Sequence, residues 1–357
     1  MGRRAAAWRV RVGARARILR ATRSTTKGGG MATIVGTFFH SHGGTTSLPP
    51  ELWVERRNAR PIRADVPNES LEVNISKANR THEGFRVLRE RIAELEPDVL
   101  VIFSDDQLEC FDFNNYPAFA VYVGDSYAKS PREPRTAEIG RHAEPGYRFP
   151  GHPELAVHLL SGVMQRGFDP AFCMDMPKPD RGLAGGVIRS VEELTDFSLP
   201  SVPIMMNLYF APQVSGLRSY QFGKAVREAL DDAPSDLRVA VAASGGLWHT
   251  PGMPGAWLNE EFDRAILARL EEGDARGMAD YFDSYVIPED DTSQDAAYRG
   301  RVSTGMPSPG GPAFGTRETC AWIAAAAVSD GRPTTIVDYI EVYASPVGNA
   351  FAYCDDV

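Results

Sequence analysis

The sequence predicts an α/β fold: a single domain with a mixed central sheet, helices on the faces of the sheet, and long loops around an active site. Apolar segments of strand length alternate with amphipathic segments of helix length from Met31 onward. The chain has 357 residues and a hydrophobic fraction of 43%, enough to bury a full core without disulfides. Polar clusters also follow several predicted strands, where open α/β sheets place their sites.

The elements follow in order from these patterns. Short apolar runs predict strands at 34–39, 98–103, 117–123, 171–174, 202–210, 237–243 and 335–343. Helical spacing of apolar residues predicts helices at 76–94, 154–166, 220–230, 258–272, 274–285 and 316–328. Segments rich in Gly, Pro and polar residues predict pocket-shaping loops at 43–75, 124–151 and 287–314, the last of them mobile.

The first 30 residues differ from the rest in charge. They hold eight arginines, one lysine and no acid, whereas the whole chain has a net charge of −9. We expect residues 1–30 to be a basic extension that is disordered or not native, with Met31 as the true start and 31–357 as the catalytic domain. The alternative is a targeting segment.

Composition also excludes several partners and locations. An acidic body is a poor match for nucleic acid. The sequence has no run approaching the roughly 18 apolar residues of a membrane span. The four cysteines form no CxxC pair, which favours a reducing, cytoplasmic setting. No GxGxxG follows a strand, and GxxxxGK[ST] and GxSxG are absent, which argues against dinucleotide, P-loop and nucleophile-elbow sites.

Two polar clusters come directly after predicted strands. His40 and His42 follow the first strand and can ligate a metal, although a histidine pair in a Gly-rich loop is the plainer interpretation. Asp105, Asp106 and Gln107 follow the 98–103 strand. Adjacent acids there can ligate a cation or hold a histidine, but they also suit a turn or an N-cap.

Three further residues are candidates for chemistry. His249 follows a strand through Ser244-Gly-Gly-Leu-Trp, and imidazole suits acid/base work near neutral pH. Glu318 opens the last helix, where the helix dipole stabilises a carboxylate, and it can also face a site as an anionic ligand. Arg181, in a loop after a strand, can hold an anionic substrate or form a surface salt bridge.

Taken together and in order, these segments resemble the class III extradiol ring-cleavage dioxygenases, of the protocatechuate 4,5-dioxygenase catalytic-subunit type. The resemblance covers most of residues 31–353. The motifs that carry it are Leu48-Pro-Pro-Glu-Leu-Trp53, Asp98-Val-Leu-Val-Ile-Phe-Ser-Asp-Asp-Gln107, Pro203–Pro212, Arg218-Ser-Tyr-Gln-Phe-Gly223, Gly245-Gly-Leu-Trp-His249, Gly315-Thr-Arg-Glu-Thr-Cys-Ala-Trp322 and Gly348-Asn-Ala-Phe-Ala-Tyr353.

The resemblance implies specific roles. Members of the family hold Fe(II) with two histidines and one glutamate, leaving positions open for a catecholate and dioxygen. Position by position, this implies His42 and Glu318 as iron ligands and His249 as the acid/base. Arg181 and Tyr209 are then expected to line the substrate pocket, with Arg181 favouring an anionic substrate.

The expected second histidine ligand is replaced by Gln107, as in a variant branch of the family with Asp-Asp-Gln at this place. Three accounts stay open. Gln107 ligates iron through its amide oxygen; His40, or else Asp106, supplies the missing ligand; or the site binds metal poorly and performs other chemistry.

The resemblance implies an Fe(II)-dependent enzyme that inserts O2 into a catechol-like or aminophenol-like ring. Its partners are then the aromatic substrate and O2, with a homo-oligomer and a small helical partner subunit as further expectations. Two alternatives remain: an enzyme of the same fold with an altered metal site and different chemistry, and a non-catalytic binding or regulatory protein.

Overall fold

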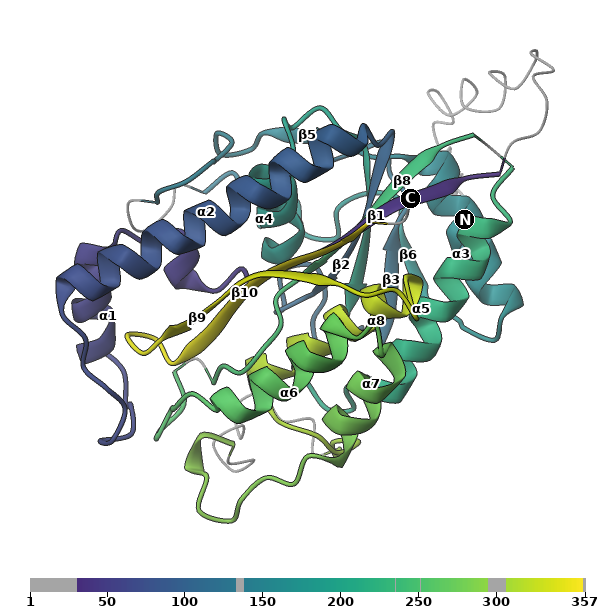
Figure 1. Cartoon of the computed structure of the whole chain (residues 1–357). Coiled ribbons are helices and arrows are strands. Elements are labelled where there is room, and N and C mark those ends of the chain that lie inside the picture. Colours follow the sequence, from purple (N-terminus) through teal and green to yellow (C-terminus); the bar gives the residue numbers. More distant parts are fainter. Residues whose placement is uncertain (1–30, 133–137, 235, 251, 295–305, 356–357) are drawn as a thin grey trace, which may run out of the picture.

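The computed structural model describes residues 31–132, 138–234, 236–250, 252–294 and 306–355. Its centre is an eight-stranded mixed sheet of order β6-β3-β7-β2-β8-β1-β10-β9 (Figure 1). The strands are β1 (Thr33–His40), β2 (Val99–Asp105), β3 (Phe119–Tyr122), β6 (Ala171–Cys173), β7 (Ser201–Met206), β8 (Arg238–Ser244), β9 (Thr335–Val342) and β10 (Val347–Asp355). A separate two-stranded sheet pairs β4 (Ser126–Ala128) with β5 (Arg148–Pro150).

The four central strands β7, β2, β8 and β1 are parallel, so their carboxyl ends meet at one edge of the sheet. β2 and β8 lie between other strands and under helices on both faces. Their sequences are accordingly apolar almost throughout, as expected for strands buried on both sides. Antiparallel strands complete the sheet: β3 pairs with β7 on one side, and β10 pairs with β1 and β9 on the other.

Helices cover both faces of the sheet. α2 (Leu71–Leu95) and α4 (Gly185–Leu194) cover one face (Figure 1). The other face carries α3 (Pro153–Gln165), α5 (Gly216–Asp231) and α8 (Thr319–Val328), with α7 (Ala275–Ser284) and α6 (Glu260–Glu271) packed outside them. Every residue of α8 is buried, which explains why this helix is apolar all round.

Short helices shape the region around the carboxyl edge. They are α1 (Trp53–Asn58) and the 3₁₀ helices η2 (Gly44–Thr46), η3 (Pro50–Leu52), η4 (Thr292–Gln294) and η6 (Phe314–Glu318). Trp53 anchors the first group, because its fully buried indole donates to the carbonyl of Leu48 at 2.9 Å. α1 is therefore tied to the body of the protein next to the carboxyl edge.

The α/β fold and all seven predicted strands are confirmed, although β7 ends at Met206 rather than 210. The predicted loop 43–75 is wrong in part, because it contains α1 and the first turn of α2. The segment 124–151 holds β4 and β5, and both α4 and β10 were missed. Much of the predicted mobile loop 287–314, and the whole expected extension 1–30, lie outside the described residues.

Among the helices of the described ranges, none combines the length and the apolar character needed to span a membrane.

Candidate active site

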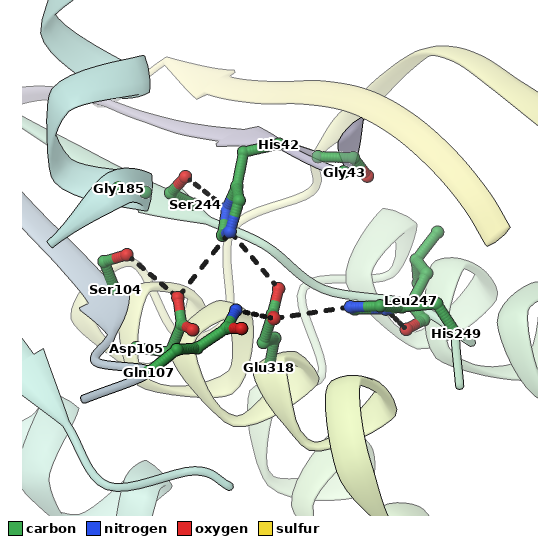
Figure 2. Close-up of polar contacts among 12 residues, drawn as sticks. His42, Gly43, Ser104, Asp105, Gln107, Gly185, Ser244, Leu247, His249 and Glu318 are labelled. Atoms are coloured by element: carbon green, nitrogen blue, oxygen red, sulfur yellow. Dashed lines mark hydrogen bonds and ion pairs between the residues drawn. The ribbon is translucent and has the colours of Figure 1, made fainter. Parts of the chain in front are cut away.

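The carboxyl ends of β1, β2 and β8 deliver polar side chains to one place, and the start of α8 faces them (Figure 2). His42 lies two residues beyond β1, Asp105 ends β2, and Ser244 ends β8. Glu318 comes from the last position of η6, where the chain enters α8. Parallel pairing of β1, β8 and β2 is what brings the three strand ends together.

His42, Asp105 and Glu318 form a compact cluster of potential metal ligands. One ligand atom from each lies within 4.8 Å of the others. His42 Nε2 is 3.7 Å from Asp105 Oδ1 and 3.7 Å from Glu318 Oε2. The side chains are 14%, 3% and 2% exposed, so bulk water reaches only the histidine edge. A buried group of one imidazole and two carboxylates suits a divalent cation.

Hydrogen bonds from neighbouring residues orient this cluster. His42 Nδ1 lies 2.8 Å from the hydroxyl of Ser244, which leaves Nε2 directed at the two carboxylates. The hydroxyl of Ser104 donates to Asp105 Oδ1 at 3.3 Å. Such outer contacts fix the ring orientation of a ligating histidine and the position of a ligating carboxylate.

Glu318 is the hub of the polar contacts. Its Oε1 accepts from the hydroxyl of Tyr209 at 2.6 Å and from the amide of Gln107 at 3.3 Å. The same oxygen is 3.3 Å from His249 Nε2, while Oε2 faces His42 (Figure 2). One carboxylate therefore joins the possible metal cluster to the imidazole of His249.

Burial and the close approach of charges shift the pKa values in opposite directions. Burial, reinforced by the charge of Glu318, raises the pKa of Asp105 well above its usual range. Burial acts the same way on Glu318, but His249, His42 and the Tyr209 hydroxyl outweigh it, so that the pKa of Glu318 is lowered. Burial lowers the pKa of His42.

The two ring nitrogens of His249 face different partners. Its Nδ1 lies 3.1 Å from the carbonyl of Leu247 and donates to it, leaving Nε2 facing Glu318. Burial favours the neutral ring, but the negative charge of Glu318 prevails and raises the pKa of His249. The backbone N–H of His249 also donates to the hydroxyl of Thr316 at 3.0 Å, which links the loop to η6.

The loop before His249 needs its two glycines. Gly245 and Gly246 have φ values of 110° and 79°, a region unfavourable for other residues. A Cβ atom on Gly245 would lie 2.4 Å from Glu318 Oε2, and one on Gly246 would lie 2.4 Å from the indole nitrogen of Trp322. The glycines therefore let the backbone pass directly against Glu318 on its way to His249.

A cavity of about 220 Å³ opens in front of these groups. Its lining includes five of the residues discussed above, namely His42, Gln107, Tyr209, His249 and Glu318. The remaining lining residues come from the segments around η2, α1 and the β9–β10 turn: Gly43, Gly44, Arg56, Arg60, Ser345 and Val347. The cavity is thus bounded by predicted site residues on one side and by unpredicted ones on the other.

Two predicted alternatives for the missing ligand, His40 and Asp106, lie elsewhere. His40 is buried between Ser190, whose hydroxyl is 2.9 Å from its Nε2, and the ring of Phe85; burial lowers its pKa to about 3. Asp106 accepts from the backbone N–H groups of Cys110 and Phe111 and so caps the turn after β2. Neither side chain belongs to the cluster of His42.

Arg181, the predicted anion-binding residue, lies apart from the cavity that the other candidates line. Arg181 is exposed in a turn whose backbone N–H bonds to Lys178, and it does not line the cavity. The cationic side chains of the cavity are instead Arg56 and Arg60. The sequence interpretation missed them because it treated 43–75 as a loop; the signal available was the segment Trp53–Asn58, with its arginines following a well-defined Pro-Pro start.

Comparisons with curated proteins find dioxygenases. A 2,3-dihydroxyphenylpropionate/2,3-dihydroxicinnamic acid 1,2-dioxygenase of Klebsiella pneumoniae is 27% identical over 172 residues, 46% of this chain and 48% of that protein. A gallate dioxygenase of Pseudomonas putida is 30% identical over 121 residues, 34% of this chain and 35% of that protein. The chain matches at most about half the length of these relatives.

A solved structure and a family profile complete the comparison. The crystal structure of an uncharacterized protein from Escherichia coli K12 has a TM-score of 0.44 and 13% identity, covering 89% of this chain and 99% of that one. The profile of the catalytic LigB subunit of aromatic ring-opening dioxygenase matches residues 70–295, more than half of the chain. The protein therefore belongs to the family of catalytic LigB subunits of aromatic ring-opening dioxygenases.

Proposed function

We propose that this protein is an Fe(II)-dependent extradiol-type dioxygenase that opens a catechol-like or aminophenol-like ring with O2. The observation that carries the proposal is the contact of Glu318 with both His42 and His249 at the floor of one cavity. A protein that only binds a ligand has no need to join a buried cluster of metal-ligand type to an imidazole poised for proton transfer. Family membership supports the same reaction class.

The residues present fit a ferrous ion, with a ligand set that differs from the one expected. We propose His42, Asp105 and Glu318 as ligands, because their atoms converge within 4.8 Å in a buried cluster. Gln107 then acts as a supporting residue, since its amide donates to Glu318 rather than turning its oxygen to the cluster. Ferrous iron held there would supply the activation of dioxygen and of the bound diol.

His249 is the proposed acid/base. Its Nε2, which lies 3.3 Å from Glu318 Oε1, is the ring nitrogen proposed to take the proton of a substrate hydroxyl and return it later, with the carboxylate of Glu318 stabilising the charged ring. Tyr209 remains protonated, because burial and the charge of Glu318 raise its pKa well above the usual range. Its hydroxyl therefore stays a donor that holds Glu318 in place and lines the substrate cavity.

Metal analysis and oxygen uptake together test this assignment. Protein prepared without oxygen and loaded with Fe(II) should hold about one iron per chain and consume O2 with some members of a catechol and aminophenol panel. Asp105→Asn should lose most of the iron, Gln107→Ala should keep more of it, and His249→Ala should keep iron but lose ring opening. For His249→Ala the rate of ring opening should fall by about 100-fold or more, which is the usual contribution of a general acid/base.

The outcomes separate the competing accounts. Iron lost in Gln107→Ala but kept in Asp105→Asn would assign the third position to Gln107. Ring opening that persists in His249→Ala would remove this residue from the mechanism. Failure of the wild-type protein to hold iron, together with no oxygen uptake over the whole panel, would contradict the proposed function and favour a binding protein or different chemistry.

A further inference from the structure

Two arginines line the cavity together with the residues at the strand ends. Arg56 lies on α1 and Arg60 lies two residues after this helix ends. Both line the same cavity as His42, Glu318 and His249. The cavity therefore has an acidic floor at the possible metal cluster and a cationic wall at α1.

Neither guanidinium forms an ion pair with an acidic side chain of the described residues. Arg60 donates through Nη1 to the hydroxyl of Ser345, a neutral group that also lines the cavity. The Nε of Arg56 is buried with no hydrogen-bond partner among the described residues. Its Nη2 lies against Gly44, where a Cβ atom would come within 2.5 Å of it. Both cations thus keep donors available to a ligand in the cavity.

Arg57, which lies between them in the sequence, is by contrast bound to backbone carbonyls. Its guanidinium donates to the carbonyl of Tyr343 at 2.9 Å and to that of Val66 at 2.6 Å. This arginine fastens α1 to the surrounding chain and does not line the cavity. On one short segment, therefore, one arginine is occupied by the fold and two are directed at the cavity.

Holding Arg56 and Arg60 together has an electrostatic cost. Burial, and secondarily the charge of Arg56, lowers the pKa of Arg60 to about 10, and burial lowers the pKa of Arg56. Partly buried cations of like charge without a counter-ion destabilise the folded protein. A bound anion between them would offset this cost.

The charges that line the cavity indicate which molecule would supply an anion to Arg56 and Arg60. The carboxylates of Asp105 and Glu318 would balance a dication held with His42, which would leave the two arginines without a counter-ion at that end of the cavity. A guanidinium presents a planar fork of donors that matches a carboxylate. We infer that Arg56 and Arg60 are specificity-determining residues that bind a carboxylate substituent of the ring substrate. This inference rests on the proposed function for the presence of the ring in the cavity.

A matched pair of probes tests the inference. Protocatechuate and its primary amide share the catechol ring and nearly the same shape, but only the acid carries a negative substituent. Their binding is measured by calorimetry without oxygen on the iron-loaded protein, and their turnover by oxygen uptake. The wild-type protein should prefer the acid on the order of 10- to 100-fold, the usual worth of hydrogen bonds to a charged group.

The variants assign the preference to residues. Arg56→Gln with Arg60→Gln should abolish it, and Arg56→Lys with Arg60→Lys should retain part of it, because the charge remains and the fork is lost. Arg57→Gln and Arg181→Gln are the controls: each removes an arginine that does not line the cavity, so the ratio of acid to amide should stay at the wild-type value. Because the readout is a ratio, a general loss of stability in a variant does not imitate the expected result.

Equal binding of acid and amide by the wild-type protein, or a preference that survives Arg56→Gln with Arg60→Gln, would overturn the inference even if oxygen uptake is normal. An arginine-dependent preference in calorimetry without oxygen uptake would uphold the carboxylate site and would count against the proposed function alone. The two failures are therefore distinguishable.

Discussion

Asp263 offers a test of the electrostatics around His249 that does not depend on a metal. The carboxyl group is completely buried and accepts from the backbone N–H of Trp248 at 2.6 Å and from the Tyr339 hydroxyl at 2.8 Å. Burial outweighs these hydrogen bonds and raises the pKa of Asp263 from 3.8 to about 7. Asp263 therefore keeps its proton in the folded protein under conditions where it loses the proton in the unfolded chain.

The sign of the effect on stability follows from linkage. Between about pH 4 and pH 7 the folded state binds one proton more than the unfolded state, so this group makes the protein less stable as the pH rises. The slope approaches about 1.4 kcal/mol per pH unit for one proton. The pKa difference of roughly three units corresponds to about 4 kcal/mol once the pH exceeds 7.

Asp263→Asn removes the titration and keeps the shape of the side chain. The amide oxygen can still accept from Trp248, and the amide nitrogen can donate to the oxygen of Tyr339. We expect the difference in free energy of unfolding between variant and wild type to move in favour of the variant as the pH rises from 5 to 8. Below about pH 4 only a constant offset from the altered hydrogen bonds should remain.

Denaturant unfolding of both proteins at several pH values between 4 and 8 measures this difference directly. Asp169→Asn, which removes an exposed carboxyl, serves as the control for the change in net charge. A difference between wild type and Asp263→Asn that stays constant across this range would refute the reasoning. It would mean that the two hydrogen bonds, and not burial, dominate the pKa of Asp263.

Two further predictions concern packing and ligand orientation. Gly223→Ala should destabilise the fold by about 1–3 kcal/mol in denaturant unfolding, because the added Cβ would lie 2.0 Å from the carbonyl oxygen of Ala324 where α5 crosses α8. The control Gly185→Ala, whose Cβ would have its nearest contact at 3.4 Å, should lower the free energy of unfolding much less. Equal losses in the two variants would contradict this account. Ser244→Ala should weaken Fe(II) binding by about 10- to 100-fold in chelator competition, because His42 loses the 2.8 Å contact at Nδ1 that orients its ring. An unchanged affinity for Fe(II) would show that the backbone alone orients His42.

The central sheet was predictable because its strands are buried on both faces. β1, β2 and β8 appear in the sequence as short apolar runs that no other element of that length explains well. α4 escaped prediction because it begins with Gly185 and Gly186 and has two glutamates just before its last residue, all unusual for a buried helix. Glu192 is nevertheless buried, since Lys129 and the backbone N–H of Ala143 bind its carboxylate. Hydrogen-bond partners that lie so far apart in the sequence cannot be predicted from local composition.

The residues of the candidate site also divide into those that the sequence could predict and those that it could not. His42, His249 and Glu318 were predictable because the first two follow strands and the third begins a helix, and the topology of a parallel sheet brings such positions together. Arg56 and Arg60 were not, because their location depends on how the long segment after η2 folds back over the cavity. The segment proposed to determine specificity thus has little of the periodicity that identifies the core elements.

The choice among Asp105, Asp106 and Gln107 shows how a local rule could have sharpened the prediction. Extending the alternation of side chains along β2 by two residues beyond its end at Asp105 would put Asp105 and Gln107 on one side and Asp106 on the other. In the structure Asp105 faces His42 and Gln107 faces Glu318, while Asp106 turns away to cap the following backbone. Replacing a histidine at 107 by glutamine therefore need not empty the site, because Asp105, two residues earlier on the same side, can provide the missing donor and adds a negative charge that an imidazole lacks. Loss of iron from Asp105→Asn but not from Gln107→Ala is the result that this alternation predicts.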